Sequence, residues 1–145
     1  MKVIINQFDA NRSFKIPKYE SEGAAGMDLS ASLQESVVLD RGKVTLIATN
    51  ISLQIPQGYE AQIRPRSGLA LKHGITVLNT PGTIDSDYRG EVKIILTNLG
   101  DAPFLINDGE RIAQMVFNKI EVVELTLGEI DKTQRGINGF GHTGQ

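Results

Sequence analysis

The sequence predicts an all-β domain, a sandwich or a barrel, and three observations lead to this prediction. Short β-prone segments recur at roughly 8–12-residue spacing along most of the chain. Two of them, residues 51–55 and 59–64, alternate apolar and polar side chains strictly, as half-buried strands do. Turn-forming residues separate the segments, among them Pro56-Gln57-Gly58 and Asn107-Asp108-Gly109.

The other predicted strands share β-branched or aromatic residues flanked by turns. They cover residues 3–5, 37–39, 44–48, 75–78, 92–96, 104–106, 111–120 and 122–127. One segment, residues 67–74, instead predicts a short helix, with Ser67 suited to the N-cap and Gly74 suited to its end. After residue 127 the apolar period stops, and the chain ends in a glycine-rich segment.

The composition limits what the protein can do. With 145 residues, the chain suits a single domain over residues 1–145, for which we expect a flexible C-terminal tail over about residues 128–145. A net charge of −2 gives no overall positive potential that would attract nucleic acid or an anionic membrane surface. Cysteine is absent and only two histidines occur, which excludes thiolate catalysis and argues against a zinc site. Because no targeting or membrane-spanning segment is visible, we expect a cytoplasmic protein.

The connection over residues 78–91, between two strand-like segments, is rich in polar and charged side chains. It is longer than the two to five residues of an ordinary hairpin loop, which indicates a functional site. Asp85 and Asp87 lie on it, and a loop carboxylate can act as a general base towards water. The alternative is that both aspartates only hold an Asx-type turn. A calcium loop is excluded, because Arg89 and Leu96 occupy positions that require oxygen ligands.

Two further stretches suggest contacts with an anionic ligand. Arg66, Ser67 and Gly68 open the predicted helix, where unpaired amides, a hydroxyl and a guanidinium favour phosphate oxygens. The alternative is a capped helix beside a surface arginine. The glycine-rich residues 139–144 match G-x-G-x-x-G, but only Gln145 follows, so no helix can complete a dinucleotide site. Two interpretations remain for residues 139–144: a segment that closes over a bound ligand, and a disordered tail.

Taken in order, these stretches resemble the five sequence motifs of the deoxyuridine triphosphatase (dUTPase) family of the trimeric type. A-G-M-D-L-S-A at residues 25–31 resembles the first motif, and R-S-G-L-A at residues 66–70 the second. N-T-P-G-T-I-D-S-D-Y-R-G-E at residues 79–91 resembles the third. G-E-R-I-A-Q at residues 109–114 and R-G-I-N-G-F-G-H-T-G at residues 135–144 resemble the last two. The fifth motif departs at Asn138, where a glycine is usual.

The resemblance implies a fold, an assembly and a reaction. It implies a distorted jelly-roll-like β-barrel or sandwich of the β-clip type, and a homotrimer whose active sites are shared between subunits. The implied reaction is hydrolysis of dUTP to dUMP and pyrophosphate by water attack at the α-phosphorus, with Mg²⁺ on the triphosphate. Such an enzyme keeps uracil out of DNA and supplies dUMP for thymidylate synthesis.

The resemblance also assigns roles to residues around the nucleoside. Asp85 matches the general base that orients and deprotonates the attacking water. Asn79 matches the hairpin that reads uracil, and Tyr88 matches the ring that lies beneath the deoxyribose and excludes a 2′-hydroxyl. Other family positions around the nucleoside are matched by Thr83, Ile84 and Lys93.

A second group of matched residues would bind phosphates or close the site. The phosphate-binding positions are matched by Arg66, Ser67, Gly68 and Gln114. The closing tail is matched by Arg135, Phe140, Gly141, His142 and Thr143, with Phe140 over the uracil. Asp28 matches an acidic position that either lies near the water ligands of Mg²⁺ or pairs with an arginine, and we do not expect it to bind the metal directly.

Two other functions are compatible with parts of this pattern. A dCTP deaminase shares the fold, but the D-S-D-Y loop at residues 85–88 and the arginine–phenylalanine tail argue against it. A nucleotide-binding or protein-binding module without turnover would not need the complete set of motifs, Asp85 included. Ammonia release from dCTP would identify the first alternative, and binding without turnover the second.

Overall fold

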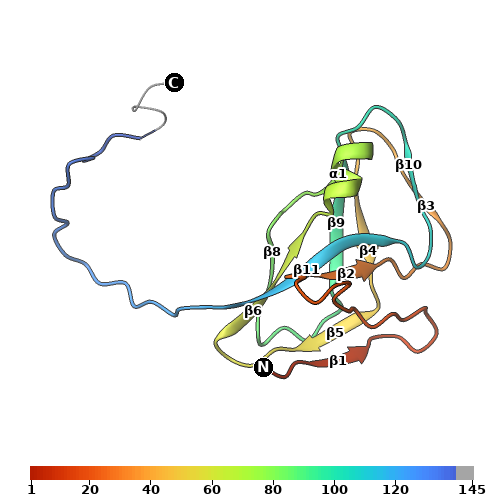
Figure 1. The fold of residues 1–145 in the computed structure, drawn as a ribbon, viewed down its shortest axis with the longest axis horizontal. Coiled ribbons are helices and arrows are strands. Elements are labelled where there is room, and N and C mark those ends of the chain that lie inside the picture. Colours follow the sequence, from red (N-terminus) through yellow and green to blue (C-terminus); the bar gives the residue numbers. More distant parts are fainter. Residues whose placement is uncertain (140–145) are drawn as a thin grey trace.

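The structure is a computed structural model that describes residues 1–139, and in this range it contains eleven strands and one short helix (Figure 1). The elements are β1 (Ile4–Gln7), β2 (Met27–Ser30), β3 (Val37–Leu39), β4 (Val44–Ala48), β5 (Ile51–Gln54), β6 (Tyr59–Arg64), α1 (Ser67–His73), β7 (Ile75–Val77), β8 (Gly82–Ile84), β9 (Lys93–Asn98), β10 (Phe104–Ile106) and β11 (Arg111–Lys119). The prediction of an all-β fold with one short helix is therefore confirmed.

The strands form separate antiparallel sheets. The larger sheets have the orders β2-β11-β6-β8 and β4-β9-β7, and two strand pairs, β1-β5 and β10-β3, complete the set. Neighbours in a sheet are distant in sequence, as in a jelly roll. Within residues 1–139 no sheet closes on itself, so the fold is a jelly-roll-like sandwich and not a closed barrel.

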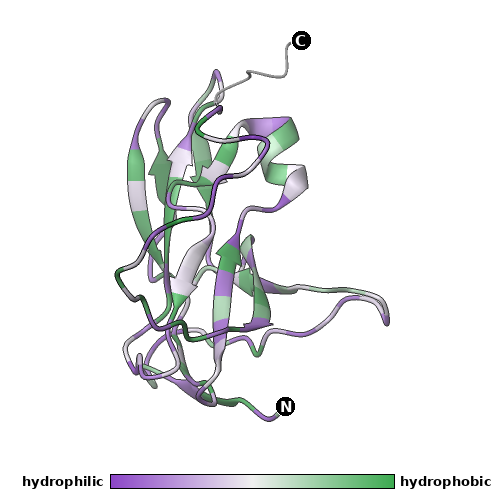
Figure 2. Ribbon diagram, turned by 90° about the vertical axis from the view of Figure 1, so that its left-hand side faces the viewer, coloured by the Kyte–Doolittle hydropathy of each residue, from purple (hydrophilic) through white to green (hydrophobic). Residues whose placement is uncertain are grey.

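The core lies where the apolar faces of the sheets meet. On β6, Ala61 and Ile63 are buried, and Met115 of β11, the partner of Ile63, is buried beside them. The residues between them on β6 point to the opposite face, because side chains alternate along a strand. In Figure 2 the strands carry green, hydrophobic bands, some of them alternating with purple or white ones, whereas the connections mix both colours. The strict alternation read from residues 59–64 is therefore the pattern of a strand with one buried face.

The predicted hairpin between residues 75–78 and 92–96 is present, since β7 pairs with β9. Its long connection is more ordered than the sequence suggested. Gly82–Ile84 forms β8, which leaves the β4-β9-β7 sheet and pairs with β6 of the other large sheet. The loop that carries Asp85 therefore begins and ends on two different sheets, which fixes it at both ends.

The N-cap of helix α1 lies one residue earlier than predicted. Arg66, not Ser67, is the N-cap: its backbone is extended, and its carbonyl accepts hydrogen bonds from the amides of Leu69 and Ala70. Ser67 is thus the first helical residue and makes no capping bond. Gly74 ends the helix in the left-handed conformation, as expected for a glycine at this position. No helix in residues 1–139 has the length and apolar character needed to span a membrane.

The predicted strand over residues 122–127 is wrong for the isolated chain. After β11 the chain runs away from the body as an extended segment (Figure 1). Val122, Leu125 and Leu127 are almost fully exposed there. β-prone residues form a strand only when another strand offers hydrogen-bond partners and a surface to pack against, and one chain offers neither to this segment.

Candidate active site

The predicted site residues fall into two clusters, the first of which we call the arginine cluster: Asp28, Arg66, Arg111 and Gln114. The Asp28 carboxylate on β2 accepts from Arg66 Nε at 3.0 Å and from Arg111 Nη1 at 2.9 Å. Arg66 Nη1 also donates to the Arg111 carbonyl at 3.0 Å, and Gln114 Nε2 donates to the Pro65 carbonyl at 2.9 Å. The pairing of β11 with β2 and β6 brings these side chains together.

The arginine cluster is suited to bind an anion. One carboxylate faces two guanidinium groups, so the three side chains together carry one net positive charge. Both oxygens of Asp28 are engaged, which orients the two arginines. Apart from the bond of Arg66 Nη1 to the Arg111 carbonyl, their other N–H groups bond to nothing within residues 1–139. Of the two alternatives given for Asp28, the structure shows the pairing with arginine. Ser67 and Gly68 lie beside the cluster at the exposed start of α1.

Arg111 is not among the site residues predicted from the sequence. The residue lies in G-E-R-I-A-Q, three positions before Gln114, and begins β11. Since the register of β11 against β2 was not predicted, nothing in the sequence placed the Arg111 side chain within reach of Asp28. Pairing Arg111 with Ser30 and Gln114 with Asp28, with a bulge between, creates this contact.

The second cluster, which we call the loop cluster, consists of Asn79, Thr83, Ile84, Asp85 and Tyr88. Asn79 lies next to Gly82, where an added Cβ would come within 3.1 Å of the Asn79 amide nitrogen. Thr83 and Ile84 belong to β8. The Tyr88 amide donates to the Asp85 carbonyl at 3.2 Å, which closes the turn after β8 through the backbone.

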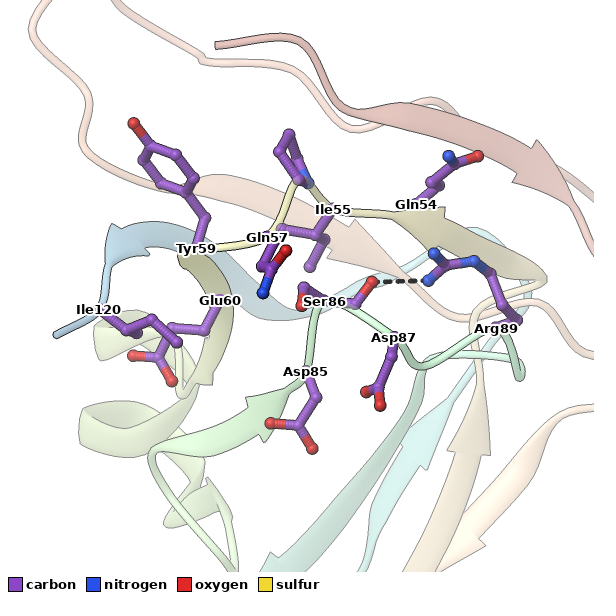
Figure 3. A pocket seen from close by; sticks show the side chains of 11 residues that line it. Gln54, Ile55, Gln57, Tyr59, Glu60, Asp85, Ser86, Asp87, Arg89 and Ile120 are labelled. Atoms are coloured by element: carbon purple, nitrogen blue, oxygen red, sulfur yellow. Dashed lines mark hydrogen bonds between the residues drawn. The ribbon is translucent and has the colours of Figure 1, made fainter. Parts of the chain in front are cut away.

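The Asp85 carboxylate is exposed, and no other residue in the range 1–139 donates a hydrogen bond to it or pairs with it. The structure thus shows no Asx-type bond here. Asp85 borders a cleft of about 750 Å³, together with Tyr59 and Glu60 at the start of β6. In Figure 3 the carboxylates of Asp85 and Asp87 point to the same side of the loop, whereas Arg89 turns back to donate to the Ser86 carbonyl at 2.7 Å. An exposed, unpartnered carboxylate is free to accept a proton from water.

One chain does not bring the two clusters together. Ile84, just before Asp85, pairs with Ala61 near the start of β6, whereas Arg66 follows the far end of the same strand. Five residues of extended chain separate these two points, a distance of roughly 15 Å. One chain therefore places the loop carboxylate and the arginine cluster near opposite ends of β6.

The remaining predicted residues lie outside both clusters. Lys93 begins β9 and is exposed, with its Nζ 3.6 Å from Oε2 of Glu91. Arg135 is also exposed, and its Nε donates to the Asn138 carbonyl at 2.9 Å. Phe140, Gly141, His142 and Thr143 lie outside the residues that the structure describes.

Comparison with known proteins agrees with the motifs. The family model described as dUTPase matches residues 12–144. The deoxyuridine 5′-triphosphate nucleotidohydrolase of Fusobacterium nucleatum subsp. nucleatum is 55% identical over 132 residues, which cover 90% of each protein. That of a Thermoanaerobacter species is 55% identical over 141 residues, covering 97% of this chain and 95% of the relative.

Solved structures show the same fold. The dUTPase of Staphylococcus bacteriophage 80alpha with dUPNHPP superimposes with a TM-score of 0.88 at 25% sequence identity, and the match covers 99% of both chains. The match therefore includes the sheets that carry both clusters. With the motifs in order, the family match over almost the whole length and relatives above half identity, the chain belongs to the dUTPase family of enzymes.

Proposed function

We propose that this protein hydrolyses dUTP to dUMP and pyrophosphate. The observation that carries the proposal is the state of Asp85: in a chain that matches the dUTPase family over residues 12–144, the carboxylate that we assign as general base is exposed, and no other residue in the range 1–139 bonds to it. The relatives named above are deoxyuridine 5′-triphosphate nucleotidohydrolases. The arginine cluster supplies the second requirement, a positive site for a polyphosphate.

In the proposed mechanism, Asp85 accepts a proton from water while the water oxygen bonds to the α-phosphorus. The bond from the α-phosphorus to the bridging oxygen breaks, and pyrophosphate leaves. Phosphoryl transfer asks a protein mainly for positioning and charge stabilisation. Arg66, Ser67, Gly68 and Gln114 would hold the phosphate oxygens, and Arg135 would add charge when the tail closes.

We expect Mg²⁺ to bind mainly through the triphosphate. Residues 1–139 contain no group of three or more carboxylate or histidine side chains able to hold a metal ion. Asp28 has both oxygens engaged by arginines, so it is placed to accept from water ligands of the metal at most. This donor set fits a cation carried by the substrate, which when bound neutralises phosphate charge.

The loop cluster would read the nucleoside. Asn79 and the backbone of residues 79–84 offer fixed donors and acceptors to uracil, with Thr83, Ile84 and Lys93 around the nucleoside and Phe140 above the base. A slot that pairs with uracil leaves buried groups unpaired when cytosine enters, at a cost of roughly 1–3 kcal/mol per group. Such a slot would favour uracil over cytosine.

We also propose a homotrimer with shared sites. Two observations support it. The loop cluster and the arginine cluster lie too far apart in one chain to act on one nucleotide, so a second copy must supply one of them. The segment after β11 exposes Val122, Leu125, Leu127 and Ile130, which would gain by packing on another subunit.

We expect two inactive variants to restore each other. Asp85→Asn and Arg66→Ala should each abolish activity alone. When both are co-expressed with different tags and purified as mixed trimers, one of the three sites in each trimer should combine an intact Asp85 with an intact Arg66 from different subunits. The measurement is dUTP turnover of the mixed assembly relative to wild type. Absence of any recovery in verified mixed assemblies would contradict shared sites.

The function itself is tested by substrate choice. Pyrophosphate release should be measured with dUTP and with the four standard deoxynucleotides, with and without Mg²⁺, and ammonia release should be measured with dCTP. Only dUTP should be turned over efficiently. Ammonia from dCTP would identify a deaminase, and dUTP binding without pyrophosphate release would identify a binding module.

We further expect UTP to be a poor substrate. If the Tyr88 ring lies beneath the deoxyribose, a 2′-hydroxyl would collide with it. The measurement is the ratio of kcat/KM for dUTP to that for UTP, which we expect to exceed about 100. Equal values for the two nucleotides would exclude this role of Tyr88.

A further inference from the structure

A buried ion pair involves Glu91, the residue whose backbone carbonyl accepts the hydrogen bond of the Tyr88 hydroxyl. Arg12, in the loop after β1, places its Nη2 2.7 Å from Oε1 of Glu91. The Glu91 side chain is only 4% exposed and that of Arg12 is 16% exposed. Oε1 of Glu91 also accepts from the Asn50 amide at 2.9 Å. A buried carboxylate with two good donors is held far more firmly than a surface ion pair.

The surroundings of this pair are rigid as well. Asn50 is completely buried, and its side-chain amide donates to the carbonyls of Asp9, Arg12 and Ser13. The Val92 amide donates to the Ile51 carbonyl at 2.8 Å, next to Glu91. Three separate parts of the chain, the loop after β1, the turn before β5 and the start of β9, are therefore tied together at Glu91.

Tyr88 rests on this anchored segment. Its hydroxyl donates to the Glu91 carbonyl at 3.0 Å. Its ring lies so close to Gly90 that an added Cβ at residue 90 would overlap the ring and the hydroxyl. The position of the ring is thus set by the backbone of residues 90 and 91, and that backbone is held by the Glu91 carboxylate.

We propose that the Arg12–Glu91 ion pair and the missing side chain at Gly90 position the Tyr88 ring and thereby determine the choice between deoxyribose and ribose. This inference rests on the proposed function, in which Tyr88 lies beneath the sugar. Arg12 and Glu91 are positioning residues, since they act through Tyr88. A shift of the ring by a fraction of an ångström makes room for a 2′-hydroxyl without removing any group that binds the phosphates.

The test is the ratio of kcat/KM for dUTP to that for UTP. A variant that only unfolds part of the protein lowers both values by the same factor, so the ratio reports the site and not the stability. Glu91→Gln keeps the size of the side chain but removes the charge that faces both Arg12 and Lys93, and we expect it to lower the ratio about tenfold. Arg12→Lys, which keeps the charge, should retain more of the ratio than Arg12→Gln. The Arg12 variants leave the contact between Glu91 and Lys93 in place, so they report the Arg12–Glu91 pair alone.

A second variant changes the position of the Tyr88 ring and leaves the side chains of Arg12 and Glu91 in place. Gly90→Ala should displace Tyr88 directly and lower the ratio at least as much as Glu91→Gln. Because both changes act through the same ring, their combination should lower the ratio by less than the product of the single effects. Ile106→Ala, a fully buried position on β10, is the control: it should lower the melting temperature and leave the ratio unchanged.

The outcomes separate this inference from the proposed function. If wild type does not release pyrophosphate from dUTP, both fail. A second outcome is that wild type prefers dUTP over UTP, but Glu91→Gln and Gly90→Ala keep a ratio within about twofold of the wild-type ratio. The ion pair then only stabilises the fold, so the inference is wrong while the proposed function stands. A lowered ratio in both variants, with an unchanged ratio in Ile106→Ala, supports the inference.

Discussion

Asp85→Asn should retain nucleotide binding and lose nearly all turnover, by about 10²–10⁴-fold. The amide has the shape of the carboxylate but cannot accept a proton from water at neutral pH. Because no other residue in the range 1–139 bonds to the Asp85 carboxylate, its loss should leave the loop in place. The measurements are pyrophosphate release and binding of a non-hydrolysable dUTP analogue.

The structure offers a matched control for this change. Asp87 lies two residues further along the same loop, borders the same cleft and points to the same side (Figure 3). Asp87→Asn removes the same charge and should keep the rate within a few-fold of wild type. Comparable losses in both variants would show that the charge of the loop matters and that Asp85 has no special role. Near-normal turnover in Asp85→Asn would remove Asp85 from the mechanism.

Deletion of residues 135–145 should reduce turnover by about 10²–10³-fold and leave the melting temperature unchanged. The deletion removes Arg135, a charge donor proposed for the closed site, together with Phe140. Of the deleted residues, those that the structure describes contribute nothing to the core: Arg135 is exposed and bonds only to Asn138, and Ile137 is fully exposed. The measurements are kcat for dUTP and thermal unfolding.

A point variant separates the effect of the Arg135 charge from the effect of shortening the chain. Arg135→Gln should reproduce a large part of the loss, whereas Lys132→Gln, an exposed cation three residues earlier, should leave kcat unchanged. A truncated chain that fails to fold would contradict the view that the tail serves only the site. Full activity of the truncated chain would show that no closing segment is needed.

The strands with a clear local pattern were predictable from the sequence. β3, β4, β6 and β10 begin and end at the predicted residues, because alternation and flanking turns define them locally. β2 and β8 were missed, since Met27–Ser30 is short and partly polar and Gly82–Ile84 follows a proline and a glycine. These two strands exist because β11 and β6 offer them partners, which no local pattern reveals.

The candidate site was predictable as a set of residues but not as an arrangement. The motifs singled out Asp85, Arg66 and Gln114 as candidate residues, and the family match over residues 12–144 spans the segments that carry them. The contact of Arg111 with Asp28 and the ion pair of Arg12 with Glu91 join residues 83 and 79 positions apart. Such contacts depend on register and topology, so a linear pattern cannot predict them.

The position of Asp85 and Arg66 at opposite ends of β6 has a consequence for the cell. In the proposed assembly, a newly made chain carries both halves of the chemistry but cannot direct them at one nucleotide. The hydrolytic power would therefore arise only on assembly, and stray monomers would leave the nucleoside triphosphate pool intact. Strand β6 would thus hold the loop cluster and the arginine cluster apart in the monomer, so that hydrolysis begins only when the oligomer forms.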